Sequence, residues 1–187
     1  MKVLETPLAG VLLIEPRVFR DARGFVFESY HAQRYYEAGI TISFVQDNHS
    51  LSKAPTLRGL HYQLDHPQAK LVRVVRGTIW DVAVDIRRGS PTFGKWVGVE
   101  LSAENARQIF IPGGFAHGFC VRKGEAEVEY KCNDYYAPKD QRGIAWNDPT
   151  LAIQWPIRDP LVSDQDRAFE RLSPDRPDLP VYSGGSS

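Results

Sequence analysis

Apolar and polar residues alternate along most of the short segments into which proline and glycine divide this chain. There are 13 Pro and 15 Gly among 187 residues, and such frequent breaks favour strands over long helices. The alternation is clearest over residues 80–87. One face of this segment holds Trp80, Val82, Val84 and Ile86, and the other holds Asp81, Ala83, Asp85 and Arg87. The pattern predicts half-buried strands and therefore an all-β fold.

A second alternating segment covers residues 126–132, and its apolar face holds Ala126, Val128, Tyr130 and Cys132. Tyr130 is therefore expected to point into the core side of a strand. No repeat of fixed period is visible along the chain. A sandwich or barrel with jelly-roll connections is the arrangement that best protects the edges of so many short strands.

Two short helices are predicted at the periphery of this fold. The first covers residues 29–38 and ends at Gly39. The second follows Ser163 and runs through Asp166 to Arg171, with Ser163 as its N-cap.

The length of the chain predicts one domain, which we place at residues 1–172. The remaining segment, residues 173–187, is polar and rich in Pro, Gly and Ser. Such a segment cannot bury apolar surface by itself, and an irregular C-terminal tail is expected.

Charge and composition argue against several classes of protein. Lys+Arg and Asp+Glu both number 23, so no broad basic surface for nucleic acid is expected. The longest apolar run near the N-terminus, Val11–Ile14, is far too short for a signal peptide or a membrane span, and a cytoplasmic protein is expected. Cys120 and Cys132 lack CxxC spacing, which favours buried thiols over a zinc site or a disulfide framework.

Phosphate-binding and hydrolase motifs such as GxGxxG, the Walker loop, HExxH and GxSxG are missing. Four residues could carry chemistry, and each also has a structural interpretation. His61 is either a proton carrier near neutral pH or a hydrogen-bonded core histidine. Lys70 could be a solvated strand end, Tyr130 a core aromatic, and Asp166 part of a helix cap.

The segment PGGFAH at residues 112–117 resembles the second cupin motif, although Val121 stands where that motif often has Asn. The first cupin motif carries an HxH pair and then a Glu, all metal ligands. Here it begins HYQ at residues 61–63, and Lys70 occupies the Glu position, seven residues before Gly77. A protonated lysine has no lone pair to give a metal, so we predict a site without metal or cofactor in which the ammonium stabilises an oxyanion.

Over about residues 11–166 the chain resembles the dTDP-4-dehydrorhamnose 3,5-epimerase family. The matching segments are FRDARGFVFESY, SFVQDNHS, LRGLHYQ, KLVRVVRGTIWDVAVDIR, PTFGKWVGVELSAEN, IPGGFAHGF and EYKCNDYY. The resemblance implies a cupin jelly-roll barrel that forms a homodimer. It also implies a dTDP-sugar substrate, epimerised at C3 and C5 in the dTDP-rhamnose pathway.

The family's catalytic positions can be carried over residue by residue. The resemblance implies that His61 is the proton acceptor, Tyr130 the proton donor, and Lys70 the residue that contacts the sugar ketone. Asp166 resembles the carboxylate that pairs with the catalytic histidine, and Asp164, two residues away, is the alternative.

The substrate-binding positions implied by the resemblance are Arg23, Glu28, Gln46, Asn48, Arg58 and His117, together with Gln141. Gln141 departs from the Glu that relatives often have there, and Gln165 from a Lys that some carry. Arg58 and His61, three residues apart, should face opposite sides of a regular strand. Either a bulge intervenes, or Arg58 serves the site of a partner subunit.

Three other functions fit parts of this pattern. An epimerase that acts only at C3 or only at C5 would be similar to this family. A non-catalytic sugar-nucleotide-binding cupin would need the arginines but not His61, Lys70 and Tyr130. A metal-dependent cupin could use only His61, His66 and His117 as histidine ligands, with Lys70 among them.

Overall fold

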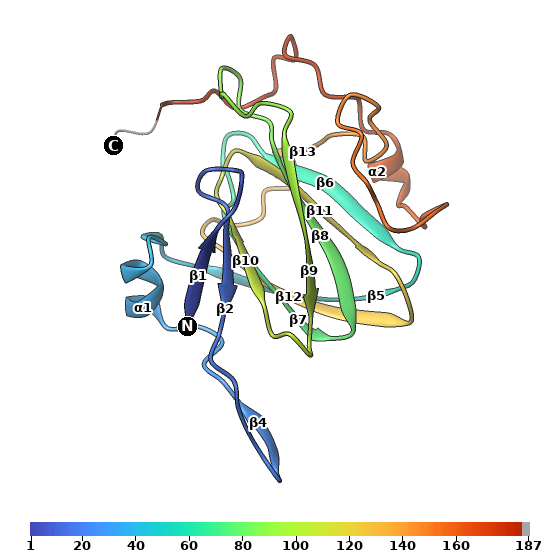
Figure 1. The fold of residues 1–187 in the computed structure, drawn as a ribbon. Helices are drawn as coiled ribbons and strands as arrows, with labels where there is room; N and C mark the ends of the chain where they lie inside the picture. The colour runs from blue at the N-terminus through green and yellow to red at the C-terminus, as the bar shows by residue number, and fades with distance from the viewer. Residues whose placement is uncertain (185–187) are drawn as a thin grey trace.

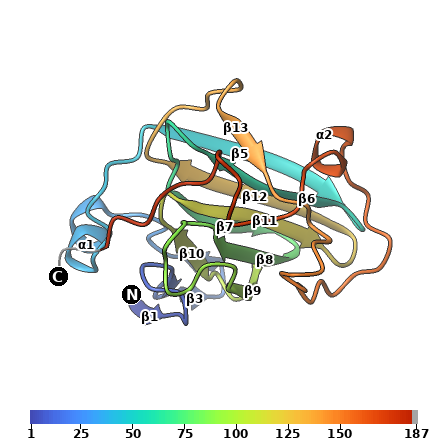
Figure 2. The same ribbon diagram turned by 90° about the horizontal axis from the view of Figure 1, so that it is seen from above.

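Two antiparallel β-sheets face each other and enclose the core of a barrel (Figures 1 and 2). The computed structural model describes residues 1–184. Within these residues one sheet has six strands, in the spatial order β1 (Lys2–Glu5), β2 (Leu12–Glu15), β10 (Gln108–Ile111), β7 (Lys70–Arg76), β12 (Glu125–Cys132) and β5 (Gln46–Lys53). The other sheet of the described chain has five, in the order β13 (Gln141–Gly143), β6 (Leu57–Gln63), β11 (Phe115–Val121), β8 (Thr78–Asp85) and β9 (Trp96–Ser102). Most neighbouring strands are not consecutive in sequence, which confirms the predicted all-β jelly-roll barrel.

Helix α1 (Ala32–Glu37) is shorter than the predicted segment of residues 29–38. The carbonyl of Ser29 accepts hydrogen bonds from the Tyr35 hydroxyl at 3.2 Å and from the Gln108 side chain at 2.8 Å. These bonds hold the first residues of the predicted segment outside the helix. Gly39 follows the helix with φ of +93°, as its role as a terminator requires.

Helix α2 (Asp164–Arg167) begins as predicted, because the Ser163 side chain accepts a hydrogen bond from the Asp166 backbone N–H at 3.1 Å. It ends earlier than predicted. The chain turns back to the five-stranded sheet, where the Ala145 N–H donates to the Glu170 carbonyl at 2.9 Å. This docking of residue 170 replaces the last helical turn.

Strand β8 is buried on both faces, and the prediction of a half-buried strand over residues 80–87 was wrong in this respect. Val82 and Val84 pack under the C-terminal segment, in one cluster with Leu151, Leu172 and Leu179. The opposite face, with Ile79 and Ala83, belongs to the core between the sheets. Asp81 lies on this inner face and is fully buried.

Strand β6 contains a bulge, which explains how Arg58 and His61 share one side of the strand. His61 pairs with His117 and Arg58 with Phe119, so β6 has one more residue than β11 between these pairs. Gly59 has φ of +118°, and a Cβ there would lie 2.7 Å from the Gly118 Cα. The close approach of the two strands therefore requires glycine at position 59.

A hairpin of β3 (Phe19–Asp21) and β4 (Gly24–Val26) extends away from the barrel (Figure 1). Among the described residues these strands pair only with each other. Phe25 and Val26 are 58% and 68% exposed, which is unusual for apolar side chains in a strand.

The C-terminal segment is irregular over residues 173–184, but it is packed on the barrel. Leu179 is buried, and the Tyr182 N–H donates to the Arg88 carbonyl at 2.9 Å. The last part of the predicted tail, residues 185–187, lies outside the described residues. No helix in the described part of the chain is long and apolar enough to cross a membrane.

Candidate active site

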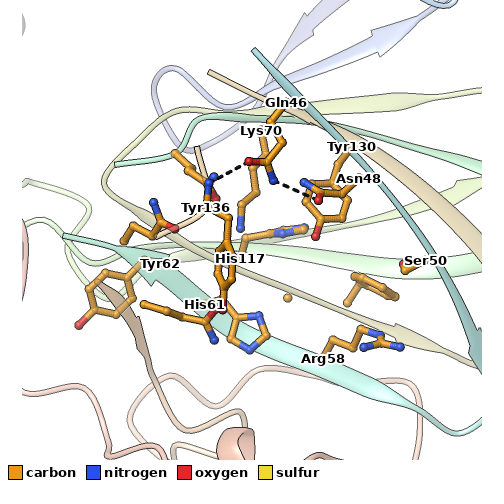
Figure 3. A pocket seen from close by; sticks show the side chains of 15 residues that line it. Gln46, Asn48, Ser50, Arg58, His61, Tyr62, Lys70, His117, Tyr130 and Tyr136 are labelled. Atoms are coloured by element: carbon orange, nitrogen blue, oxygen red, sulfur yellow. Dashed lines mark hydrogen bonds between the residues drawn. The ribbon is translucent and has the colours of Figure 1, made fainter. Parts of the chain in front are cut away.

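A cavity of about 320 Å³ lies between the two sheets and is drawn in Figure 3. Eight of the predicted site residues line it: Gln46, Asn48, Arg58, His61, Lys70, His117, Tyr130 and Gln141. Its other lining residues were not predicted: Ser50, Tyr62, Gln63, Gln68, Gly118, Phe119 and Tyr136. Side chains far apart in sequence thus meet in one pocket.

His61 is held by a carboxylate from outside the barrel. Its Nε2 lies 2.6 Å from Oδ1 of Asp166, and the other carboxylate oxygen accepts the Gly59 N–H at 2.9 Å. Burial opposes ionisation of Asp166, but the bonds and charge of His61 and the Gly59 N–H hold its pKa below the ordinary value. An ionised Asp166 keeps a proton on Nε2 and leaves Nδ1 of His61 free to accept one. Asp164 makes no such contact with His61.

Lys70 is the first residue of β7, and its amine lies inside the pocket 6.0 Å from the centre of the Tyr130 ring. Burial lowers the pKa of Lys70 below 10.5, while Cys132 and Asp81 act in the opposite direction. A buried ammonium in a low-dielectric pocket interacts strongly with any negative charge that develops beside it.

Tyr130 reaches the pocket from the six-stranded sheet, where it pairs with Asn48 of β5. Burial raises the pKa of its hydroxyl above 10, so the phenol keeps its proton at neutral pH. The predicted apolar face of residues 126–132 does point inward. The Tyr130 hydroxyl on this face, however, is directed at the cavity (Figure 3).

The second histidine of the pocket, His117, also contacts a carboxylate. Its Nε2 lies 2.8 Å from Oδ2 of Asp81 on β8. His117 and His61 are partners across β11 and β6. Each histidine therefore contacts an aspartate, although only Asp166 was predicted as such a partner from the sequence.

Polar groups continue toward the mouth of the cavity. The guanidinium of Arg58 is held by the Ser52 hydroxyl at 2.9 Å, and the Gln46 amide donates to Asn48 at 3.1 Å. The Gln46 carbonyl oxygen accepts the Tyr136 N–H at 2.9 Å, which ties the loop after β12 to the pocket. These groups could hold the polar parts of a ligand, with Arg58 suited to a phosphate.

Two predicted binding residues, Arg23 and Glu28, are not brought to this cavity. Arg23 forms an ion pair with Asp21 at 2.6 Å at the exposed hairpin. Glu28 accepts a hydrogen bond from Arg34 at 2.8 Å. Within one chain the two residues therefore lie apart from the pocket.

A metal site finds no support in the arrangement of ligands. Over residues 1–184 there is no cluster of three His, Cys, Asp or Glu side chains that could hold an ion. His66, one of three histidines considered as ligands, lies outside the pocket with its ring 3.4 Å from Asp134. The pocket brings together an imidazole, a phenol and a lysine amine, which are groups that can support proton transfer next to a carbonyl group.

Comparisons with known proteins agree with this chemistry. The family model described as dTDP-4-dehydrorhamnose 3,5-epimerase matches residues 5–174. A relative of that name from Pseudomonas aeruginosa is 57% identical over 169 residues, which cover 89% of this chain and 93% of the relative. A crystal structure of an epimerase from Legionella pneumophila, in complex with dTDP-4-keto-L-rhamnose, has a TM-score of 0.95 at 49% identity and covers 98% of this chain and 99% of that chain.

A further solved structure is a 3'-monoepimerase from Streptomyces bikiniensis in complex with dTDP-quinovose. It has a TM-score of 0.84 at 34% identity and covers 90% of this chain and 87% of that chain. The fold, the pocket and these relatives define an isomerase of the cupin type. The chain belongs to the dTDP-4-dehydrorhamnose 3,5-epimerase family.

Proposed function

We propose that the protein inverts C3 and C5 of dTDP-4-dehydro-6-deoxy-D-glucose to give dTDP-4-dehydro-L-rhamnose, using no cofactor. One observation carries this proposal: His61, Lys70 and Tyr130 surround a single cavity, and Asp166 holds His61. A merely sugar-binding protein would have no need of this set of proton-transfer groups. The Legionella pneumophila relative, bound to dTDP-4-keto-L-rhamnose, supports the choice of substrate.

The positions of these groups support the following proton transfer. Nδ1 of His61 takes the proton from the carbon next to the C4 ketone, and the electron pair of that C–H bond moves to form an enolate with its charge on O4. The Lys70 ammonium stabilises this oxyanion. Tyr130 then gives its hydroxyl proton to the same carbon from the other face, and solvent restores the proton on Tyr130 and removes the one on His61.

We also propose that the protein works as a homodimer in which the β3–β4 hairpin serves the partner's site. Arg23 of the hairpin lies outside its own cavity, and Phe25 and Val26 beside it are exposed. Strand β5, which carries Gln46 and Asn48, is the last strand of its sheet in the described chain and offers an unpaired edge. An arm that reaches this edge from a second copy would bring Arg23 toward the diphosphate beside Arg58.

We also propose that the protein works in the cytoplasm, without a nucleic-acid or membrane partner. Both cysteines are free thiols, as expected in a reducing compartment. The equal numbers of acidic and basic residues support a local anion site and no extended basic surface.

Incubation with dTDP-4-keto-6-deoxyglucose in deuterated water tests the proposal directly. NMR of the recovered sugar should show deuterium at both C3 and C5, together with inversion at both carbons. Similarity to the 3'-monoepimerase makes a single-position enzyme the second candidate, and label at one carbon only would identify it. Binding of the sugar nucleotide without any exchange would show a non-catalytic binding protein and reject the proposal.

A further inference from the structure

We propose that Asp81 is a positioning residue of the active site, whose carboxylate orients His117 and provides the counter-charge for the Lys70 ammonium. This inference rests on the proposed function. Asp81 does not line the cavity, so it would act through these two neighbours and not by touching the substrate.

The burial of Asp81 is not explained by the stability of the fold. Its side chain is fully buried on β8, where its register partners are Phe119 and Val99. Taking a carboxylate out of water is costly unless several hydrogen bonds compensate. Among the described residues, Oδ2 has only the contact with His117 at 2.8 Å, and Oδ1 has no hydrogen-bond partner.

Asp85, four residues later on the same strand, shows what a structural carboxylate looks like here. It is equally buried, but both of its oxygens are satisfied. Oδ1 accepts from Nε of Arg87 at 2.9 Å, and Oδ2 accepts from Ser90 and Thr92 at 2.6 Å each. The contrast indicates that Asp81 is retained for its charge and its place beside the pocket.

The Lys70 amine is the positive charge that the Asp81 carboxylate can balance. Burial lowers the pKa of Lys70, and two groups oppose this effect, Cys132 and Asp81. Burial also raises the pKa of the Cys132 thiol, so at neutral pH that group is uncharged. The Asp81 carboxylate is then the remaining group that would favour the protonated amine.

His117 receives its orientation from the same carboxylate. An ionised Asp81 keeps a proton on Nε2, which fixes the tautomer of the ring that faces the substrate. The arrangement matches that of His61 with Asp166 across the same strand pair. Asp166 is hydrogen-bonded at both oxygens, however, whereas Oδ1 of Asp81 has no hydrogen-bond partner among the described residues.

The test compares Asp81→Asn with the matched variant Asp85→Asn in the full-length protein. Thermal unfolding, kcat, KM and the pH profile of kcat/KM are measured for both variants and for wild type. Asp81→Asn should lower kcat at least ~10-fold with little change in KM, because the amide keeps the shape and removes the charge.

The titratable groups that face Lys70 are Asp81 from β8, Tyr130 and Cys132 from β12, and His61 and His117 across the pocket. Loss of the Asp81 charge should therefore move the alkaline limb of the profile to lower pH.

Asp85→Asn should lower the unfolding temperature while leaving kcat and the alkaline limb near those of wild type. Equal effects of the two variants, or a folded Asp81→Asn enzyme with normal kcat and an unmoved alkaline limb, would overturn the proposal. A second measurement needs no variant: the ¹³C carboxyl shift of Asp81 and the ¹⁵N shifts of His117 in labelled wild-type protein. An ionised Asp81 and a proton on Nε2 of His117 at pH 7 support the proposal, and a protonated Asp81 rejects it.

These NMR measurements also separate this inference from the proposed function. If wild-type protein gave no exchange with the sugar nucleotide, the proposed function would fail. The charge state of Asp81 and the tautomer of His117 would still decide whether this carboxylate is a counter-charge for the pocket.

Discussion

His61 and Tyr130 reach one cavity from opposite sheets, His61 from β6 and Tyr130 from β12. A sugar ring bound between them would present a different face to each side chain. This relationship is what inversion requires, since a proton must leave from one face and return to the other. Lys70 begins β7, the neighbour of β12, and its amine lies 6.0 Å from the centre of the Tyr130 ring.

Replacement of His61 by Asn should lower kcat by at least ~10²-fold, the low end for a positioned general base. The unfolding temperature and the affinity for dTDP should change little, because the amide still fits beside Asp166. His66→Asn is the matched control, since His66 lies outside the cavity. Near-normal turnover by folded His61→Asn would return His61 to a structural role.

Tyr130→Phe should separate hydrogen exchange from inversion. The base at His61 remains, so deuterium should still enter the substrate, with configuration largely retained. Accumulation of inverted sugar should slow by ~10²-fold or more, the usual effect of a lost general acid. Tyr35→Phe serves as control because its hydroxyl bonds Gln108 away from the pocket. Simultaneous loss of exchange and inversion would mean that the phenol also helps to form the enolate.

Co-expression of two impaired variants tests the crossed hairpin. Arg23→Ala should raise KM for the sugar nucleotide, and His61→Asn should lower kcat. If Arg23 serves the partner's cavity, co-expressed heterodimers contain one site with both changes and one with neither, so activity is regained. The molecular mass is measured to verify that dimers have formed. If the dimers are then no more active than the separate variants, Arg23 contributes to the site of its own chain or to no site.

Chelation with EDTA should leave turnover unchanged. The position where a metal-binding cupin has its Glu ligand carries Lys70, whose ammonium offers no lone pair. Rates are measured after exhaustive dialysis, with and without added divalent ions. Loss of turnover that a divalent ion restores would contradict the proposed mechanism.

Asp140 should stabilise the loop after β6 in a pH-dependent way. Burial opposes its ionisation, but the N–H groups of His66, Asp65 and Leu64 hold its pKa below the ordinary value. Its contribution is therefore present above the unfolded pKa of ~3.9 and is lost as pH falls through the lower folded pKa. Asp140→Ala should lower the free energy of unfolding by ~1–3 kcal/mol at pH 7, and by less near pH 3. Urea titrations at the two pH values measure the difference, and an equal loss at both would contradict the assignment.

Much of the barrel could be predicted from alternation, because a strand with one apolar face repeats with period two. The inward face of β12, with Tyr130, was predicted in this way. Alternation predicted the burial of β8 incorrectly. The C-terminal segment covers the outer, apolar face of this strand, and the polar residue Asp81 is buried on the inner face. A contact between segments so distant in sequence leaves no local pattern.

The candidate site was predicted mainly through resemblance to the family, and the structure brings eight of its eleven predicted residues to the cavity. Asp166 lies just beyond the cavity wall against His61, and Arg23 and Glu28 lie elsewhere in the chain. The sequence did not single out Tyr136 or Asp81. Asp85, on the same face of the predicted strand as Asp81, is equally acidic.

The contact between His61 and Asp166 joins positions 105 residues apart, and Asp166 belongs to a helix that follows the last strand of the barrel. During synthesis the strands that form the cavity emerge from the ribosome before this helix does. A nascent chain can therefore complete its barrel while its base still lacks the carboxylate that holds it. Full activity is therefore expected only after translation has passed residue 166 and Asp166 has reached His61.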